Sequence, residues 1–305
     1  MKIAITGATG FIARVLVDKL LEANHSLLLL VRNPERARNL YPNKNLEIVS
    51  YVATQSGSWQ DSLDGCDAVI NLAGEPIADR WSNQYKQKIL QSRQIGTQKI
   101  VKAIAKASSK PKILINASAI GYYGSSQNET FDENSGPAEG DFLSQVCQLW
   151  EAEAKQASNF GTRVAILRFG IVLGSGGGAL GRMLPAFEFF AGGPIGTGTQ
   201  WFSWIHILDL VNLIIFTLDH REMEGCYNAT APNPVKMFQF CETLAKVLNR
   251  PCWLPVPSIA MELLLGEGAQ VVLQGQKVLP KRTLDTGFTY NYPDLEQALK
   301  QILIP

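Results

Sequence analysis

The chain has 305 residues, of which 46% are hydrophobic and 18% charged, and 28 Lys and Arg against 27 Asp and Glu leave a formal net charge of +1. This apolar content offsets chain entropy in one large or two ordinary domains, so it excludes a disordered chain. A near-neutral chain without a long basic run lacks the electrostatic footprint of a nucleic-acid-binding protein.

The sequence gives no sign of a membrane anchor, a leader or a metal site. Its longest apolar stretches, near 27–31 and 210–218, fall short of the roughly 20 residues that span a bilayer. The amino terminus has neither the apolar core of a secretory signal nor the Arg-rich and Ser-rich character of a transit peptide. Five cysteines without a Cys-x-x-Cys pair and three scattered histidines argue against a disulfide framework or a metal. We therefore expect a cytoplasmic protein.

The first half of the chain alternates β-rich runs with segments of helical periodicity. Strands are expected at Lys2–Thr6, Ser26–Val31, Leu46–Tyr51, Ala68–Leu72, Lys112–Ala117 and Thr162–Phe169. The sequence Arg32-Asn33-Pro34 is expected to stop the second of them. Helices are expected at Phe11–Ala23, Asn83–Ala107 and Phe142–Asn159. Apolar strands separated by helices indicate a parallel sheet covered on both faces. The sequence therefore predicts an α/β protein with a doubly wound parallel sheet, a Rossmann fold.

The sequence pattern changes after Gly170, where frequent glycines and prolines divide the chain into short elements. We expect residues 1–170 to form the Rossmann domain, with its sheet completed by parts of 200–230. Residues 171–305 are expected to form a smaller mixed α/β lobe that binds substrate. In open α/β sheets ligands bind at the carboxyl edge, so we expect this lobe to cover that edge.

The sharpest motif is Gly7-Ala8-Thr9-Gly10-Phe11-Ile12-Ala13, directly after the first strand. Gly7 permits a tight turn, Gly10 lets a pyrophosphate approach the positive end of the helix, and Ala13 still allows close helix–strand packing. The spacing is GxxGxxA and not the GxGxxG of ordinary dehydrogenases. A simple glycine turn is the alternative, which the flanking strand and helix disfavour.

A second glycine-rich segment, Gly176-Gly177-Gly178-Ala179-Leu180-Gly181, satisfies GxGxxG. No βαβ unit with an acidic residue about 20 positions on follows it. We therefore expect a glycine-rich loop at the edge of the site and not a second nucleotide site.

The end of the second strand indicates which coenzyme the glycine turn receives. An NAD enzyme places Asp or Glu there to bind the ribose 2′-hydroxyl, whereas this strand ends in Leu30-Val31-Arg32. A guanidinium pairs with a 2′-phosphate through two hydrogen bonds. The sequence therefore predicts NADP(H), with a solvated surface arginine as the alternative reading of Arg32.

Several motifs in order carry a resemblance over essentially the full length. They are Gly7–Ala13, Asn71-Leu72-Ala73-Gly74-Glu75, Ser118-Ala119-Ile120-Gly121-Tyr122-Tyr123-Gly124, Gly192-Gly193-Pro194-Ile195-Gly196 and Trp204-Ile205-His206-Ile207-Leu208-Asp209. With them the chain resembles the extended short-chain dehydrogenase/reductase superfamily, and more closely its atypical subgroup labelled "epimerase family protein" or nucleoside-diphosphate-sugar epimerase. Neither label fixes an activity.

The resemblance implies a set of cofactor-binding residues. These are Gly7, Thr9, Gly10, Phe11 and Ile12 at the pyrophosphate, Arg32 at the 2′-phosphate, Leu72 and Ala73 beside the adenosine, Lys88 and Arg93 as cations for a phosphate or ribose, and Val172 beside the nicotinamide. For Lys88 and Arg93, exposed charges on a helix face remain the alternative.

The chain departs from the superfamily at its chemistry. Extended members use Tyr-x-x-x-Lys, but none of the eight tyrosines here has a lysine four positions later, and the expected pair falls near Leu143 and Cys147. A free tyrosine has a pKa of about 10, so only about one in a thousand is phenolate at pH 7. An epimerase that oxidises first needs that base, whereas a reductase needs only an acid.

Tyr122 or Tyr123, with Ser118, is the predicted acid and carbonyl-polarising group, with a scaffold role as the alternative. Three functions stay open: an NADP(H)-dependent oxidoreductase acting on a small carbonyl or nucleotide-linked substrate, a non-catalytic NADP(H)-binding regulatory or redox-sensing protein, and a sugar-nucleotide epimerase with a substitute base. The substrate, the partners and the oligomeric state are not indicated.

Overall fold

The computed structural model describes residues 1–42, 44 and 46–304. Within them, seven strands form one parallel sheet in the order β11-β7-β5-β4-β1-β2-β3. The strands are β1 (Lys2–Thr6), β2 (Ser26–Val31), β3 (Glu47–Ser50), β4 (Ala68–Asn71), β5 (Ile113–Ala119), β7 (Arg163–Phe169) and β11 (Gly225–Ala229). The predicted doubly wound parallel sheet is confirmed, and its seventh strand comes from beyond residue 200.

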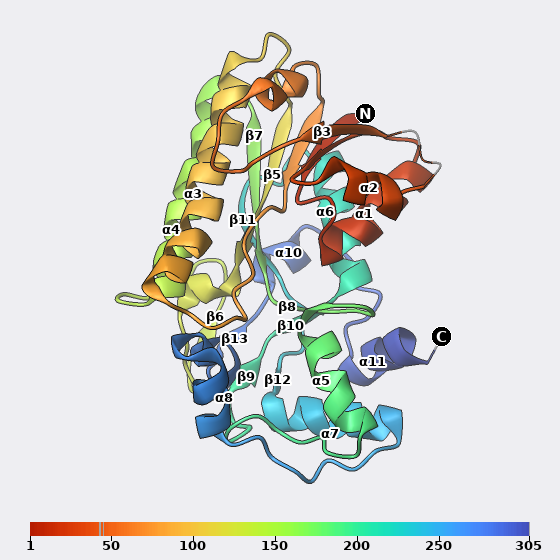
Figure 1. The fold of residues 1–305 in the computed structure, drawn as a ribbon, viewed down its shortest axis with the longest axis vertical. Coiled ribbons are helices and arrows are strands. Elements are labelled where there is room, and N and C mark those ends of the chain that lie inside the picture. Colours follow the sequence, from red (N-terminus) through yellow and green to blue (C-terminus); the bar gives the residue numbers. More distant parts are fainter. Residues whose placement is uncertain (43, 45, 305) are drawn as a thin grey trace.

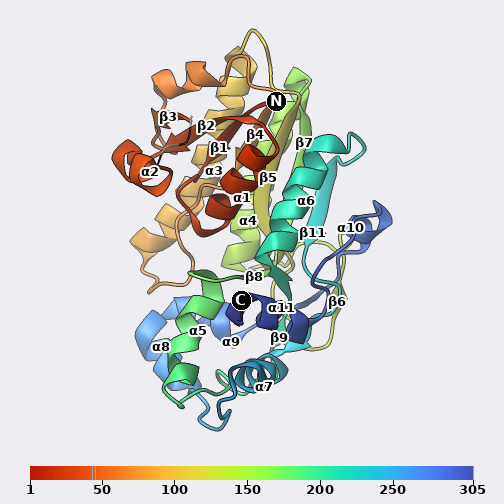
Figure 2. The same cartoon turned by 90° about the vertical axis from the view of Figure 1, so that its right-hand side faces the viewer.

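Helices cover both faces of this sheet (Figures 1 and 2). One face carries α3 (Asn83–Lys106) and α4 (Phe142–Lys155), and the other carries α1 (Phe11–Glu22) and α6 (Ile207–Asp219). Central strand residues such as Ile5 are fully buried between the two layers. Strands apolar on both sides pack this way because each face meets a helix.

Side-chain caps set where several helices begin. Ser82 accepts a hydrogen bond from the Tyr85 amide at the start of α3, and Asp141 accepts one from the Ser144 amide at the start of α4. The sequence Arg32-Asn33-Pro34 was expected only to stop β2, but α2 (Pro34–Leu40) begins there. Asn33 caps it, and proline suits the first helical position because its missing amide needs no partner.

A smaller mixed lobe follows the carboxyl ends of the strands (Figure 1). Its elements are β8 (Ile171–Leu173), α5 (Gly178–Glu188), β9 (Trp201–Phe202), β10 (Trp204–His206), β12 (Val235–Lys236), α7 (Met237–Leu248), α8 (Ser258–Leu265), α9 (Gln270–Leu273), β13 (Lys277–Val278), α10 (Lys281–Asp285) and α11 (Leu295–Leu303). Short β6 (Thr130–Phe131) pairs with β13, so the first half of the chain reaches into the lobe. The described part of the chain also contains the 3₁₀ helices η1 (Ser58–Leu63), η2 (Ile120–Tyr123), η3 (Gln156–Phe160) and η4 (Glu267–Ala269).

Two buried side chains at the start of α6 fasten the carboxyl-terminal segment. Both carboxylate oxygens of Asp209 accept backbone amides, from Asn291 at 2.8 Å and Tyr292 at 2.9 Å. His206 caps α6 through Nδ1, and its Nε2 lies 2.8 Å from Gln301 Oε1. Burial lowers the pKa of His206 to about 4, so the ring is neutral near pH 7. Their polar atoms therefore join the start of α6 to the carboxyl-terminal segment.

Two features are absent from the described residues. None of their helices combines the length and the apolar character needed to cross a bilayer. Nowhere in residues 1–42, 44 and 46–304 do three His, Cys, Asp or Glu side chains gather as a metal ion would require.

Candidate functional site

The glycine turn after β1 is shaped by close approach to β4. Gly7 has φ +66°, and a Cβ there would stand 2.9 Å from the carbonyl of Leu72. The Gly10 amide donates to the Gly7 carbonyl at 2.9 Å, which closes the turn. Helix α1 then starts with no side-chain cap and no acidic residue in its first turn. Its positive end is therefore open to an anion.

Buried side chains hold this turn against its neighbours. Thr6 donates to Asn71 Oδ1 at 2.7 Å and accepts the amides of Leu72 and Ala73, each at 3.2 Å. On the other side, the Tyr41 hydroxyl donates to the Ala8 carbonyl at 2.6 Å. The turn and the end of β4 are thus fixed in place before any ligand arrives.

The second glycine-rich segment packs over Phe11. A Cβ on Gly177 would lie 2.6 Å from the Phe11 ring, and one on Gly178 would lie 3.1 Å from the ring and 2.9 Å from the Val172 carbonyl. Glycines are needed here because the ring leaves no room for side chains. The segment lies against the first residue of α1, and from Gly178 on it is the helix α5 and not the expected loop. Phe11 and Val172 therefore both contact this segment.

Arg32 stands at the end of β2 with 73% of its side chain exposed. Its Nη1 lies 2.8 Å from Oε1 of Glu75, which follows β4. Arg32, the residue predicted to bind the 2′-phosphate, is thus paired with the Glu75 carboxylate in this structure. Nothing in the local sequence pattern predicts this contact.

Of the two cations predicted on α3 to bind the coenzyme, only Arg93 reaches the segment that follows β4. Its guanidinium donates to the carbonyls of Ile89 at 3.1 Å and Glu75 at 3.0 Å, and a Cβ on Gly74 would lie 3.1 Å from it. Burial lowers the pKa of Arg93, and no acidic side chain within the described ranges forms an ion pair with it. Lys88 is exposed and forms no hydrogen bond or ion pair with any described residue, so the structure does not bring it to the site.

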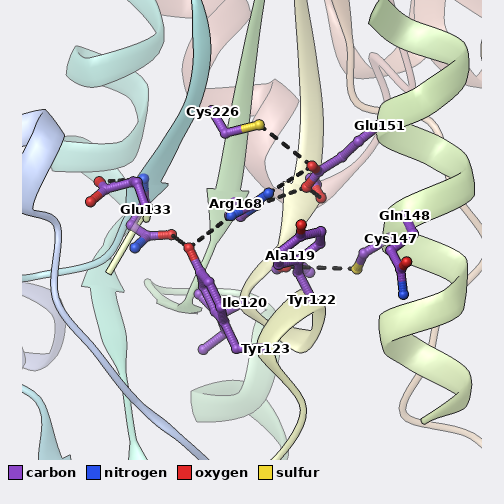
Figure 3. A network of polar contacts seen from close by, with 12 residues as sticks. Ala119, Ile120, Tyr122, Tyr123, Glu133, Cys147, Gln148, Glu151, Arg168 and Cys226 are labelled. Carbon is purple, nitrogen blue, oxygen red and sulfur yellow. Dashed lines mark hydrogen bonds and ion pairs between the residues drawn. The ribbon is translucent and has the colours of Figure 1, made fainter. Parts of the chain in front are cut away.

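The predicted acid groups lie at the end of β5 and in η2, where Ser118 and Tyr123 belong to a buried network, part of which Figure 3 shows. Arg168 forms two hydrogen bonds with Glu151, both 2.8 Å, and their side chains are 3% and 2% exposed. Ser118 donates to the same carboxylate at 2.7 Å. On the far side, Arg168 donates to the Tyr123 hydroxyl at 2.9 Å, which donates to Asn228 at 2.7 Å. The hydroxyls of Ser118 and Tyr123 thus both donate their hydrogen bonds within the network.

Electrostatics holds this network in one protonation state. Burial lowers the pKa of Arg168, but the hydrogen bonds and charge of Glu151 raise it above its ordinary value. Burial raises the pKa of Tyr123 to about 12, so its phenol stays neutral. A base made from Tyr123 is therefore disfavoured.

Tyr122 differs from its neighbour. Its ring lies 3.5 Å from the Arg168 guanidinium carbon, and its carbonyl accepts the Ser144 hydroxyl at 2.7 Å. Its side chain is partly exposed, and its hydroxyl makes no hydrogen bond within the described part of the chain. Among the three predicted acid groups, Tyr122 alone keeps a free hydroxyl among the residues described.

The positions that carry Tyr and Lys in the superfamily lie on α4 against η2. A Cβ on Gly121 would meet the Leu143 Cβ at 3.4 Å, and the Cys147 thiol lies 3.6 Å from the Ala119 carbonyl. Burial raises the pKa of Cys147 to about 12. Cys147 is therefore a neutral thiol and no substitute for the lysine.

Sequence reasoning missed Glu151, Arg168, Asn228 and Tyr41. A signal existed for Arg168, since a charge inside the apolar run of β7 demands a buried partner. Nothing local marks the others, because each partner is distant along the chain.

Taken together, the fold and the glycine turn define a dinucleotide-binding protein of the short-chain dehydrogenase/reductase type. Residues 3–229 match the NAD dependent epimerase/dehydratase family, and residues 256–302 match a domain of unknown function (DUF1731). The chain belongs to the NAD dependent epimerase/dehydratase family.

Relatives extend the likeness over the whole chain. The epimerase family protein SDR39U1 homolog, chloroplastic, of Arabidopsis thaliana is 47% identical over 99% of this chain and 87% of its own length. The epimerase family protein YfhF of Bacillus subtilis is 42% identical over 99% of this chain and 98% of its own. A crystal structure of human epimerase family protein SDR39U1 (isoform 2) with NADPH has a TM-score of 0.89 and 36% identity, covering 99% of both chains.

Proposed function

We propose that this chain binds NADPH at the carboxyl ends of β1, β2 and β4 and uses it to reduce a small carbonyl or nucleotide-linked substrate. The observation that carries the coenzyme part is the uncapped glycine turn together with Arg32, and not Asp or Glu, at the position directly after β2. The human relative crystallised with NADPH supports the same coenzyme.

The residues of the turn fit this coenzyme. Gly7 and Gly10 leave backbone amides uncovered at the start of α1, where a pyrophosphate is stabilised. Leu72 and Ala73 have their amides turned to Thr6, which leaves apolar surface for an adenosine. Val172 and Phe11 lie together farther along the edge.

The chain's own part in the reaction is to donate a proton. When bound, NADPH supplies a hydride. Tyr122 has the free hydroxyl, and it gives its proton to the substrate oxygen as the hydride reaches the carbonyl carbon. The Arg168 guanidinium lies over its ring and fixes the position of that side chain. Ser118 and Tyr123 then act by holding Arg168 in place. Epimerisation through a substitute base finds no support, because Leu143 and Cys147 fill the usual positions.

A second function, NADPH binding without catalysis, is favoured by one specific observation. The hydroxyls of Ser118 and Tyr123 are locked into a buried network, an arrangement that suits a scaffold. The two functions differ only in what Tyr122 does.

Turnover in matched tyrosine variants separates these functions. NADPH oxidation is followed with a panel of aldehydes, ketones and keto-sugar nucleotides, and NADPH affinity is followed by fluorescence. We expect Tyr122→Phe to reduce turnover at least about a hundredfold with unchanged NADPH affinity, whereas Tyr123→Phe, which removes only a hydroxyl that positions Arg168, reduces turnover much less. Tight NADPH binding without turnover on any carbonyl would support the non-catalytic function instead.

A further inference from the structure

The ion pair between Arg32 and Glu75 crosses the coenzyme edge of the sheet. Strand β1 lies between β2 and β4, with Thr6 beside Leu30 on one side and Asn71 on the other. Arg32 follows β2 and Glu75 follows β4, so their contact at 2.8 Å spans the carboxyl end of β1. This is the edge where the glycine turn opens.

The backbone of Glu75 is fixed, but its carboxylate is not. Its amide donates to the Ser92 hydroxyl at 3.1 Å, and its carbonyl accepts Arg93 Nη2 at 3.0 Å. Its side chain is 29% exposed and forms its ion pair with Arg32 alone among the described residues. The carboxylate can therefore leave Arg32 by rotation of its own side chain, with β4 unmoved.

A carboxylate and a phosphate compete for the same donors on a guanidinium. Both accept its paired N–H groups, and the phosphate carries the greater charge. An exposed ion pair is weak, so a dianionic group bound beside it can displace the carboxylate.

We propose that Glu75 is a built-in competitor for the 2′-phosphate of NADPH. Its carboxylate pairs with Arg32 in the free protein and leaves when the phosphate binds. This competition weakens NADPH binding and so limits the preference for NADPH over NADH. NADH has no group that requires Arg32, and it leaves the pair in place. This inference rests on the proposed coenzyme, and Glu75 acts through Arg32 as a specificity-determining residue.

The test is a set of coenzyme titrations by fluorescence on the full chain. In Glu75→Gln we expect the Kd for NADPH to fall about threefold, the effect of removing one exposed ion pair, with the Kd for NADH unchanged. Adenosine 2′,5′-bisphosphate carries the 2′-phosphate but no nicotinamide, and we expect its Kd to fall by the same factor. The control Glu35→Gln removes a nearby carboxylate on α2 and leaves both affinities unchanged.

A second background separates competition from simple charge repulsion. In Arg32→Gln there is no guanidinium to compete for, so adding Glu75→Gln changes the NADPH affinity no further. The inference is overturned if Glu75→Gln leaves NADPH affinity unchanged or weaker, or if the gain persists in the Arg32→Gln background or appears in Glu35→Gln. If the unmodified chain binds no NADPH, the proposed function fails first and this inference with it.

Discussion

The two halves of the sheet's carboxyl edge have opposite characters. At β1, β2 and β4, the glycine turn leaves the start of α1 uncapped and Arg32 is exposed. At β5 and β7, Ser118, Glu151, Arg168 and Tyr123 are buried and hydrogen-bonded to one another. One half presents unused donors to a ligand, and the other uses its polar groups on itself.

The contrast indicates how this family member departs from a base-using epimerase. Binding a dinucleotide needs backbone amides and space, and both are retained. Proton abstraction needs a tyrosine with a lowered pKa, whereas burial raises the pKa of Tyr123 to about 12. In the half at β5 and β7 the buried polar groups are thus hydrogen-bonded to one another, with Tyr122 at the margin.

The largest effect is expected from breaking the closed half. Glu151→Ala leaves the Arg168 guanidinium buried without its carboxylate, which should lower the free energy of unfolding by about 3–5 kcal/mol. Denaturant unfolding measures it. The control Glu22→Ala removes the exposed partner of Lys19, and a loss there as large as in Glu151→Ala would contradict the contrast.

Breaking the open half should impair binding as well as stability. Gly7→Ala places a Cβ 2.9 Å from the Leu72 carbonyl at φ +66°, so we expect a loss of about 2–3 kcal/mol and at least tenfold weaker NADPH binding. The control is Gly176→Ala, at φ +77° with open space around it. It has the same backbone strain as Gly7→Ala but no steric clash. Equal NADPH affinity in the two variants would argue against a shaped turn.

The loss of folding stability in acid is expected to come from His206 at the start of α6 and not from the glycine turn and Arg32. The pKa of His206 is about 4 in the folded chain and 6.5 when unfolded. Between those values the unfolded chain binds a proton that the folded chain does not, so stability falls as pH drops from 6.5 toward 4, by about 2 kcal/mol. His206→Asn keeps the helix cap and should flatten this slope in unfolding measured against pH. An unchanged slope would assign the effect elsewhere.

The sequence predicted those parts of the molecule that depend on local patterns. Six strands of the sheet and helices α1, α3 and α4 follow from apolar periodicity, and the turn at Gly7 follows from its spacing. The seventh strand, β11, is predicted only as an unspecified part of 200–230. Helix α2 was missed because Asn33-Pro34 was treated as a stop, although the same pair caps and starts a helix.

Contacts between distant segments were beyond local patterns. Tyr123 meets Asn228, 105 residues away, and Arg32 meets Glu75, 43 residues away. Only the folded sheet brings these ends together. A resemblance alone also does not place a side chain. It implies that Lys88 binds the coenzyme, whereas in the structure Lys88 is exposed and makes no contact with the glycine turn.

The most direct test of the central claim compares NADPH and NADH binding to the unmodified chain and to Arg32→Asp. If the open edge is a site for the phosphorylated coenzyme, the unmodified chain binds NADPH at least about tenfold more tightly than NADH, since one guanidinium–phosphate pair is worth that much, and the substitution abolishes the difference. Equal affinity for the two coenzymes in the unmodified chain, or affinity for neither, would contradict the account.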